Sequence, residues 1–128
     1  MKTARAARAN ALLEVIAANG RHFFEYEGRT SAFEVDDRHR VWLVDSYKGD
    51  RIYVYGNGRW RGFHQGGTLR RLVEYLRDYI RFGTPIPPAQ LGPWPEWYCG
   101  GDLWGYGEDM ETVRAAARNL GIVMEVMK

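Results

Sequence analysis

Apolar side chains recur at helical spacing in three segments of this chain. Residues 68–82 show the clearest stripe, and Gly83 supplies the expected end. A third amphipathic segment begins at Asp109 and stops at Gly121. Residues 4–19 carry helical spacing at Ala9, Leu12, Leu13 and Ile16. The pattern therefore predicts three helices.

Between the first two helices the period changes to two, which is typical of strands that have one buried face. Residues 41–44 are apolar on both faces and indicate a central strand. Short turns favour pairing between consecutive strands, so we expect a five-stranded antiparallel meander. Alternation predicts its other strands at residues 22–27, 31–36, 51–55 and 60–64.

The predicted fold class is α+β, with a five- to six-stranded, mostly antiparallel sheet. The N-terminal helix and the long central helix should pack on one face of it, while the last helix flanks an edge. Residues 122–127 would add the sixth strand, and a short strand is expected at 97–99. Left at an edge, segment 122–127 would pair across a dimer, which is the hypothesis for a homo-oligomer.

Asn57-Gly58 is the strongest turn signal, because both central residues of a type I′ hairpin need positive φ. With these two residues as the loop, Tyr55 faces Trp60, and directly opposed residues share a face. One face should be core and carry Ile52, Val54 and Phe63, with Arg59 and Arg61 at the tip. The other is a candidate contact surface that carries Arg51, Tyr53, Tyr55, Trp60 and His64.

Composition narrows the class of protein. The chain has 128 residues and a net charge of +2, so we expect one domain over residues 1–128 and any electrostatic binding to be local. The single cysteine, Cys99, excludes a disulfide framework and fits a reducing compartment. Since no apolar run approaches the roughly 20 residues of a membrane span, we expect a soluble cytoplasmic protein without a membrane partner.

Residues 84–107 form a loop rich in proline and tryptophan. It holds all five prolines and three of the five tryptophans, Trp94, Trp97 and Trp104. A segment this long without a clean period is typical of a functional loop. The tryptophans would form either a contact patch stiffened by proline or a satellite core that covers one end of the sheet.

Trp, Tyr and Arg are the residue types most enriched at binding hot spots. The candidate partner-binding residues are Arg51, Tyr53, Tyr55, Arg59, Trp60, Arg61, Trp94, Trp97 and Trp104. The alternative is that the charges merely pair between strands, worth about 0.2 to 1 kcal/mol per pair. In that case Glu25, Glu27, Glu34 and Asp36 on the first strands would face Arg40, Arg51, Arg59 and Arg61.

A candidate anion site lies where the hairpin joins the central helix. Helix N-termini present free N–H groups, and an arginine would complete a phosphate or carboxylate clamp. Its residues are Gly66, Gly67, Thr68 as expected N-cap, Arg70 and Arg71. The segment lacks the spacing of known phosphate loops, and glycines here also serve as a plain turn.

No cofactor or metal is expected, because no two histidines have helix-face spacing. The ligand candidates would be His22, His39 and His64 with Asp36, Asp37 or Asp102. Cys99 would be either a nucleophile with His64 or His39 as base, or a small packed residue.

The sequence favours a non-catalytic binding protein, a small inhibitor or adaptor that engages a protein or ribonucleoprotein through its aromatic and arginine surface. One alternative is a nucleic-acid-binding domain, in which the hairpin aromatics stack bases while arginines neutralise phosphate. A second alternative is a small enzyme that uses His64 or Cys99 in a pocket under the 84–107 loop.

Overall fold

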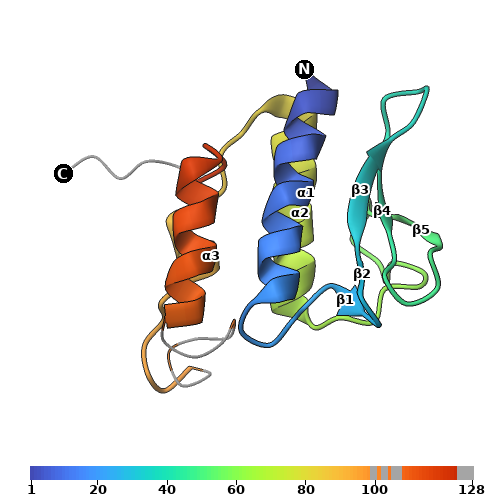
Figure 1. Ribbon diagram of the computed structural model, residues 1–128. Helices are drawn as coiled ribbons and strands as arrows, with labels where there is room; N and C mark the ends of the chain where they lie inside the picture. Colours follow the sequence, from blue (N-terminus) through green and yellow to red (C-terminus); the bar gives the residue numbers. More distant parts are fainter. Residues whose placement is uncertain (99–100, 102–103, 105–107, 124–128) are drawn as a thin grey trace.

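Three helices and two small antiparallel sheets make up the part of the chain that the computed structural model describes, residues 1–98, 101, 104 and 108–123. They form layers, with the sheets on one side, α1 and α2 in the middle and α3 on the other side (Figure 1). The helices are α1 (Lys2–Ala18), α2 (Gly67–Phe82) and α3 (Glu108–Asn119), and a short 3-10 helix, η1, covers Pro88–Leu91.

The three predicted helices are confirmed. Gly83 ends α2 in the left-handed conformation with φ 77°, as expected, whereas the N-cap is Gly66 rather than Thr68. The N-terminal and central helices both pack against the sheet, and α1 also contacts α3. The expectation that the last helix flanks a sheet edge is wrong, because α3 packs on α1 on the side away from the sheet (Figure 1).

The prediction of a single five- to six-stranded meander is also wrong. Strands β1 (Glu25–Tyr26) and β2 (Arg29–Thr30) form a separate two-stranded sheet. Strands β3 (Ala32–Val35), β4 (Val41–Val44) and β5 (Arg51–Tyr53) form a three-stranded sheet in that order.

Backbone conformation explains why the first predicted strand is short. His22 and Phe24 have φ values of 56° and 64°, which an extended strand cannot adopt. Phe24 is thereby buried in the core, and its carbonyl accepts a hydrogen bond from the N–H of Ser31 at 2.8 Å. Ser31 is buried between the two sheets, so the chain changes direction there instead of continuing one sheet.

The predicted hairpin beyond β5 does not form. Trp60 and Phe63 are both buried, with ring centroids 5.3 Å apart. In a strand these two residues would point to opposite faces. Here a turn brings both into the core: Gly62 has a φ of 88°, and the Phe63 N–H donates to the Trp60 carbonyl at 3.1 Å. Core packing of two large rings therefore prevails over the local turn signal at Asn57-Gly58.

The predicted last strand does not lie beside the three-stranded sheet in its described part. Val123 forms an isolated parallel bridge with Ile86, and the Ile86 N–H donates to the Ile122 carbonyl at 2.8 Å. Residues 124–127 lie outside the described residues. Of the strand expected at 97–99, Trp97 and Tyr98 belong to a turn and Cys99 lies outside the described residues.

No helix in the described ranges has both the length and the apolar character that a bilayer crossing requires.

Candidate functional site

The three-stranded sheet has one face turned away from the helices. Its register aligns Glu34 on β3, Trp42 on β4 and Tyr53 on β5 across this outer face. The neighbouring register of Phe33, Leu43 and Ile52 is buried against the helices. Side chains of one strand alternate between faces, so the buried register fixes which residues the outer face presents.

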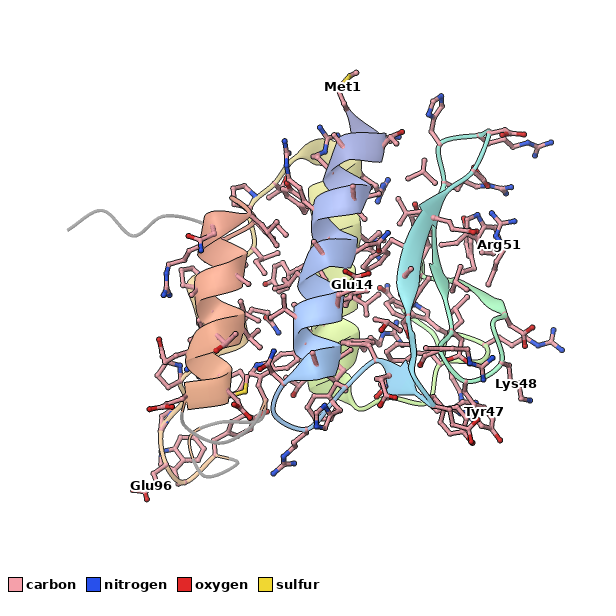
Figure 2. The ribbon with its side chains drawn as sticks, viewed as in Figure 1. Met1, Glu14, Tyr47, Lys48, Arg51 and Glu96 are labelled. Carbon is pink, nitrogen blue, oxygen red and sulfur yellow. The ribbon has the colours of Figure 1, made fainter. Side chains whose placement is uncertain are left out.

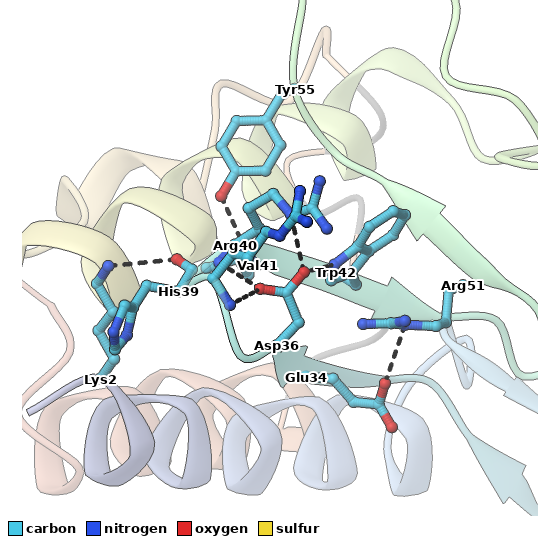
Figure 3. Close-up of polar contacts among 10 residues, drawn as sticks. Lys2, Glu34, Asp36, His39, Arg40, Val41, Trp42, Arg51 and Tyr55 are labelled. Carbon is cyan, nitrogen blue, oxygen red and sulfur yellow. Dashed lines mark hydrogen bonds and ion pairs between the residues drawn. The ribbon is translucent and has the colours of Figure 1, made fainter.

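Three aromatic rings, Trp42, Tyr53 and Tyr55, form a row on this outer face, which we call the aromatic row. The rings of Trp42 and Tyr53 are 5.1 Å apart, and those of Tyr53 and Tyr55 are 4.7 Å apart. Tyr53 in the middle is 47% exposed. The Tyr55 hydroxyl accepts a hydrogen bond from the Val41 N–H at 2.9 Å, which fixes one end of the row (Figure 3).

Arginines flank both ends of the aromatic row. The guanidinium carbons of Arg51 and Arg40 lie 4.5 Å and 5.5 Å from the Trp42 ring centroid. Those of Arg77 and Arg81, from α2, lie 5.4 Å and 5.1 Å from the Tyr55 centroid. Each such contact is worth about 0.5 to 1 kcal/mol at an exposed site, so the arginines help to hold the rings in place.

Every one of these four arginines also faces a carboxylate. Glu34 lies 3.3 Å from Arg51 (Figure 3). Asp78 lies 3.0 Å from Arg77 and 3.6 Å from Arg81. Asp36 lies 2.8 Å from Arg40. The outer face therefore carries both signs of charge in close pairs. Figure 2 shows Arg51 on the side of the sheet that is turned away from the helices.

Asp36 organises the turn between β3 and β4. Its carboxylate accepts the Trp42 indole N–H at 2.9 Å, the Arg40 Nε at 2.8 Å, and the backbone N–H groups of Arg38 and Arg40, both at 2.9 Å (Figure 3). The indole hydrogen bond, followed by the donors of Arg40 and Arg38, outweighs desolvation and holds the pKa of Asp36 well below its usual range. Asp36 is therefore charged at neutral pH and fixes Trp42 at the other end of the aromatic row.

Some of the residues predicted for partner binding are accessible in the structure, and others are buried. Arg51 and Tyr53 are exposed, Tyr55 is half-buried, and Arg59 and Arg61 are exposed. The placement of Trp60 and Trp104 on a contact surface is wrong, because they are only 3% and 1% exposed and belong to the core. Trp94 is half-buried and Trp97 is exposed, and both lie in the 84–107 loop, as the sequence places them, where they line a groove with the start of α2.

Sequence reasoning missed Trp42 and the two helix arginines, Arg77 and Arg81. The apolar run of β4 suggested a strand covered on both sides, whereas Trp42 is only half-buried on the outer face. Arg77 and Arg81 are four residues apart on the polar stripe of α2, a spacing that puts both on one helix face. This four-residue spacing is the sequence signal that could have identified the two arginines as neighbours.

A groove of about 440 Å³ continues the outer face beside β5. Its lining includes Trp42, Arg51 and Tyr53 from the sheet, Tyr47 from the turn after β4, and Arg61 and His64 from the segment after β5. His64 therefore lies beside β5, whereas the enzyme hypothesis placed it under the 84–107 loop, and none of the described residues of that loop lines this groove.

The candidate anion residues do not all lie together. Gly67, Thr68 and Arg71 line a second groove together with the loop aromatics. Gly66 is the N-cap of α2 and is exposed. Arg70 turns away, since its guanidinium stacks 4.2 Å from the Trp60 centroid and donates to the Gly56 carbonyl at 3.0 Å.

Among the described residues, no three His, Cys, Asp or Glu side chains are grouped so that they could hold a metal ion. A ring nitrogen of His22 is instead 2.9 Å from the Ala17 carbonyl oxygen. Cys99 and Asp102, two of the residues considered for catalysis or metal binding, lie outside the described residues.

Comparison with known proteins identifies a relative of similar sequence but no similar solved structure. A protein of Bacillus subtilis (strain 168) described as "SPbeta prophage-derived uncharacterized protein YoqU" is 27% identical over 120 residues, which are 91% of this chain and 81% of that protein. No solved structure matches the chain. The model of the YoqU family matches residues 2–128, and the chain therefore belongs to the YoqU family.

Proposed function

We propose that this protein is a non-catalytic binding module, a small inhibitor or adaptor, which engages a protein partner through the outer face of its three-stranded sheet. The observation that carries the proposal is the aromatic row, in which half-exposed Tyr53 lies between Trp42 and Tyr55. Tyr, Trp and Arg dominate binding hot spots because they bury large areas and also form directional polar contacts.

The aromatic row is ordered before any partner binds. Tyr55 is held by the Val41 N–H, Trp42 by Asp36, and the Arg77 guanidinium donates to the Val54 carbonyl at 2.6 Å. Side chains that are already fixed lose less conformational entropy on association. A rigid row of this kind suits recognition of a defined protein surface.

The charge pattern favours a protein over a nucleic-acid strand on this face. Four arginines, Arg40, Arg51, Arg77 and Arg81, already pair with Glu34, Asp36 and Asp78. A phosphate backbone would be repelled by these carboxylates, whereas a protein surface of mixed charge would be complementary to them. The partner is therefore a protein, either alone or as the protein part of a ribonucleoprotein.

A cytoplasmic setting is part of the proposal, because the lone cysteine fits a reducing compartment. The relative from Bacillus subtilis is described as prophage-derived, so a bacterial lysate is the appropriate source of a partner.

The proposal is tested by affinity capture from a Bacillus subtilis lysate with the tagged protein and two tyrosine variants. We expect Tyr53→Ala to weaken binding of the captured protein about tenfold or more, which corresponds to about 1.4 kcal/mol or more. Tyr26→Ala is the matched control, because Tyr26 is 39% exposed and Tyr53 47% exposed, and Tyr26 lies on β1 of the separate two-stranded sheet.

Three results would count against the outer face as a protein-binding surface. Equal affinity of the wild type and Tyr53→Ala for the captured protein would be the first. Equal weakening by Tyr26→Ala would be the second, since it would indicate a non-specific aromatic effect. Capture that disappears with nuclease and falls steeply with salt would favour the nucleic-acid alternative instead.

A further inference from the structure

A groove of about 440 Å³ separates the first turns of α2 from the 84–107 loop, and we call it the loop groove. Its residues come from two segments that are far apart in the sequence. Its lining comprises Gly67, Thr68 and Arg71 from α2, and Gln90, Trp94, Pro95, Trp97 and Tyr98 from the loop. The loop groove lies apart from the outer sheet face, so a ligand bound there would not depend on the proposed function.

The aromatic wall of the loop groove is held in place by local contacts. The Trp94 N–H donates to the Gly101 carbonyl at 2.7 Å, and the Tyr98 N–H donates to the Pro95 carbonyl at 2.9 Å. The Tyr98 ring packs edge-on against Trp94 and Trp97, with centroids 5.7 Å and 6.2 Å apart. The Tyr98 hydroxyl is also 3.2 Å from the Thr68 hydroxyl, which ties the loop to α2.

Trp97 is the least buried aromatic side chain of the described residues, at 85% exposure. Because the loop is held in place by these contacts, the exposed face of the Trp97 indole is available for stacking with the flat ring of a ligand. Two other tryptophans, Trp60 and Trp104, are buried in the core, and Trp42 and Trp94 are half-buried.

The charge of the loop groove is positive. Arg71 is the single charged side chain among its described lining residues. No ion pair within the described part of the chain involves Arg71, in contrast to the arginines of the outer face. Glu96 lies in the same loop but is not part of the lining, and Figure 2 shows it at the outer end of the loop. An unpaired guanidinium selects an anionic group, above all a phosphate, because its donors match phosphate oxygens.

We propose that the loop groove binds a nucleotide, with the base stacked on Trp97 and the phosphate paired with Arg71. The hydroxyl of Thr68 and the amide of Gln90 line the same groove and offer donors and acceptors to the sugar or to the base edge. This chemistry is shared by a free nucleotide and by one nucleotide of a single strand, and the test separates the two sources.

The test uses the full chain, with NMR detection of the tryptophan indole N–H signals. The probes are adenosine 5′-monophosphate, adenosine, inorganic phosphate and an eight-residue thymidine oligonucleotide. We expect saturable shifts of the Trp97 signal with the monophosphate, and weaker ones with adenosine or phosphate alone. A free nucleotide is the source if the monophosphate binds as tightly as the oligonucleotide, and a strand is the source if the oligonucleotide binds much more tightly.

Two variants should each weaken binding about tenfold, namely Trp97→Ala, followed through the Trp94 signal, and Arg71→Gln. Because both side chains are exposed, neither variant should unfold the protein. Two control variants each remove an exposed side chain away from the loop groove: Arg118→Gln on α3 matches Arg71→Gln, and Tyr47→Ala beside the sheet matches Trp97→Ala. Both controls should bind the monophosphate like the wild type.

The proposal would be overturned by the absence of saturable shifts at millimolar monophosphate and with the oligonucleotide. It would also be overturned if inorganic phosphate bound as well as the monophosphate, since the ring would then contribute nothing. Unchanged affinity in Arg71→Gln would remove the phosphate contact and overturn it as well.

Discussion

Asp36 shows how much one carboxylate can fix. Its oxygens accept hydrogen bonds from the Trp42 indole, the Arg40 side chain and two backbone N–H groups, so all its partners are donors. An asparagine in its place would present an NH₂ group to some of these donors. We expect Asp36→Asn to lower the melting temperature at neutral pH and to loosen the Trp42 end of the aromatic row.

The effect should depend on pH with a defined sign. The pKa of Asp36 is lower in the folded protein than in the unfolded chain, so its contribution to stability is present above about pH 4 and is lost as the pH falls through the folded pKa. The gap in melting temperature between the wild type and Asp36→Asn should therefore narrow below about pH 4. Thermal unfolding followed by circular dichroism measures the gap, and Asp37→Asn, at a neighbouring position, is the control. A gap that is constant with pH would contradict the assignment.

At the scale of elements, Asn10 joins α1 to the three-stranded sheet. Its side-chain oxygen accepts the Phe33 N–H at 2.6 Å, and its amide group donates to the Phe33 carbonyl at 3.1 Å. The Asn10 side chain thus satisfies both backbone groups of a residue on β3. Asn10→Ala would leave them unpaired at the part-buried edge of β3, which should lower the free energy of unfolding by about 1 to 3 kcal/mol.

Urea unfolding of Asn10→Ala and Glu14→Ala would measure this contribution. Glu14 is exposed on the same helix, as Figure 2 shows, so its replacement should change the free energy of unfolding by less than about 0.5 kcal/mol. Equal stability of the two variants would show that water replaces Asn10 at the β3 edge.

The helices and the sheet differ in how far the sequence could predict them. The helices were predictable because each carries its own stripe and a stop signal such as Gly83. The extent of the sheet was not, since the alternation around Trp60 and Phe63 matches a strand but both rings are buried. Of the site, Arg51 and Tyr53 were predictable from strand alternation. The Asp36–Trp42 contact was not, because it depends on the β3–β4 turn.

For the whole molecule, the position of a tryptophan in the layers decides its role, and the sequence does not reveal that position. Trp60 and Trp97 both looked like anchors of a contact surface. In the structure Trp60 is 3% exposed, packs on Phe63 and lies under Arg70, whereas Trp97 is 85% exposed. One ring belongs to the shared core of the sheet and helices, and the other to the surface of the loop groove.

The two tryptophans should therefore differ in their effect on global stability. Trp60→Ala opens a cavity in the core and should lower the free energy of unfolding by about 3 to 5 kcal/mol, a large part of the roughly 5 to 15 kcal/mol typical of a domain. Trp97→Ala should change it by less than about 0.5 kcal/mol. Guanidinium unfolding monitored by far-ultraviolet circular dichroism measures both, because that signal does not rely on the tryptophan removed. A stable Trp60→Ala variant would mean that its ring is not part of the core, and would return it to the candidate contact surface.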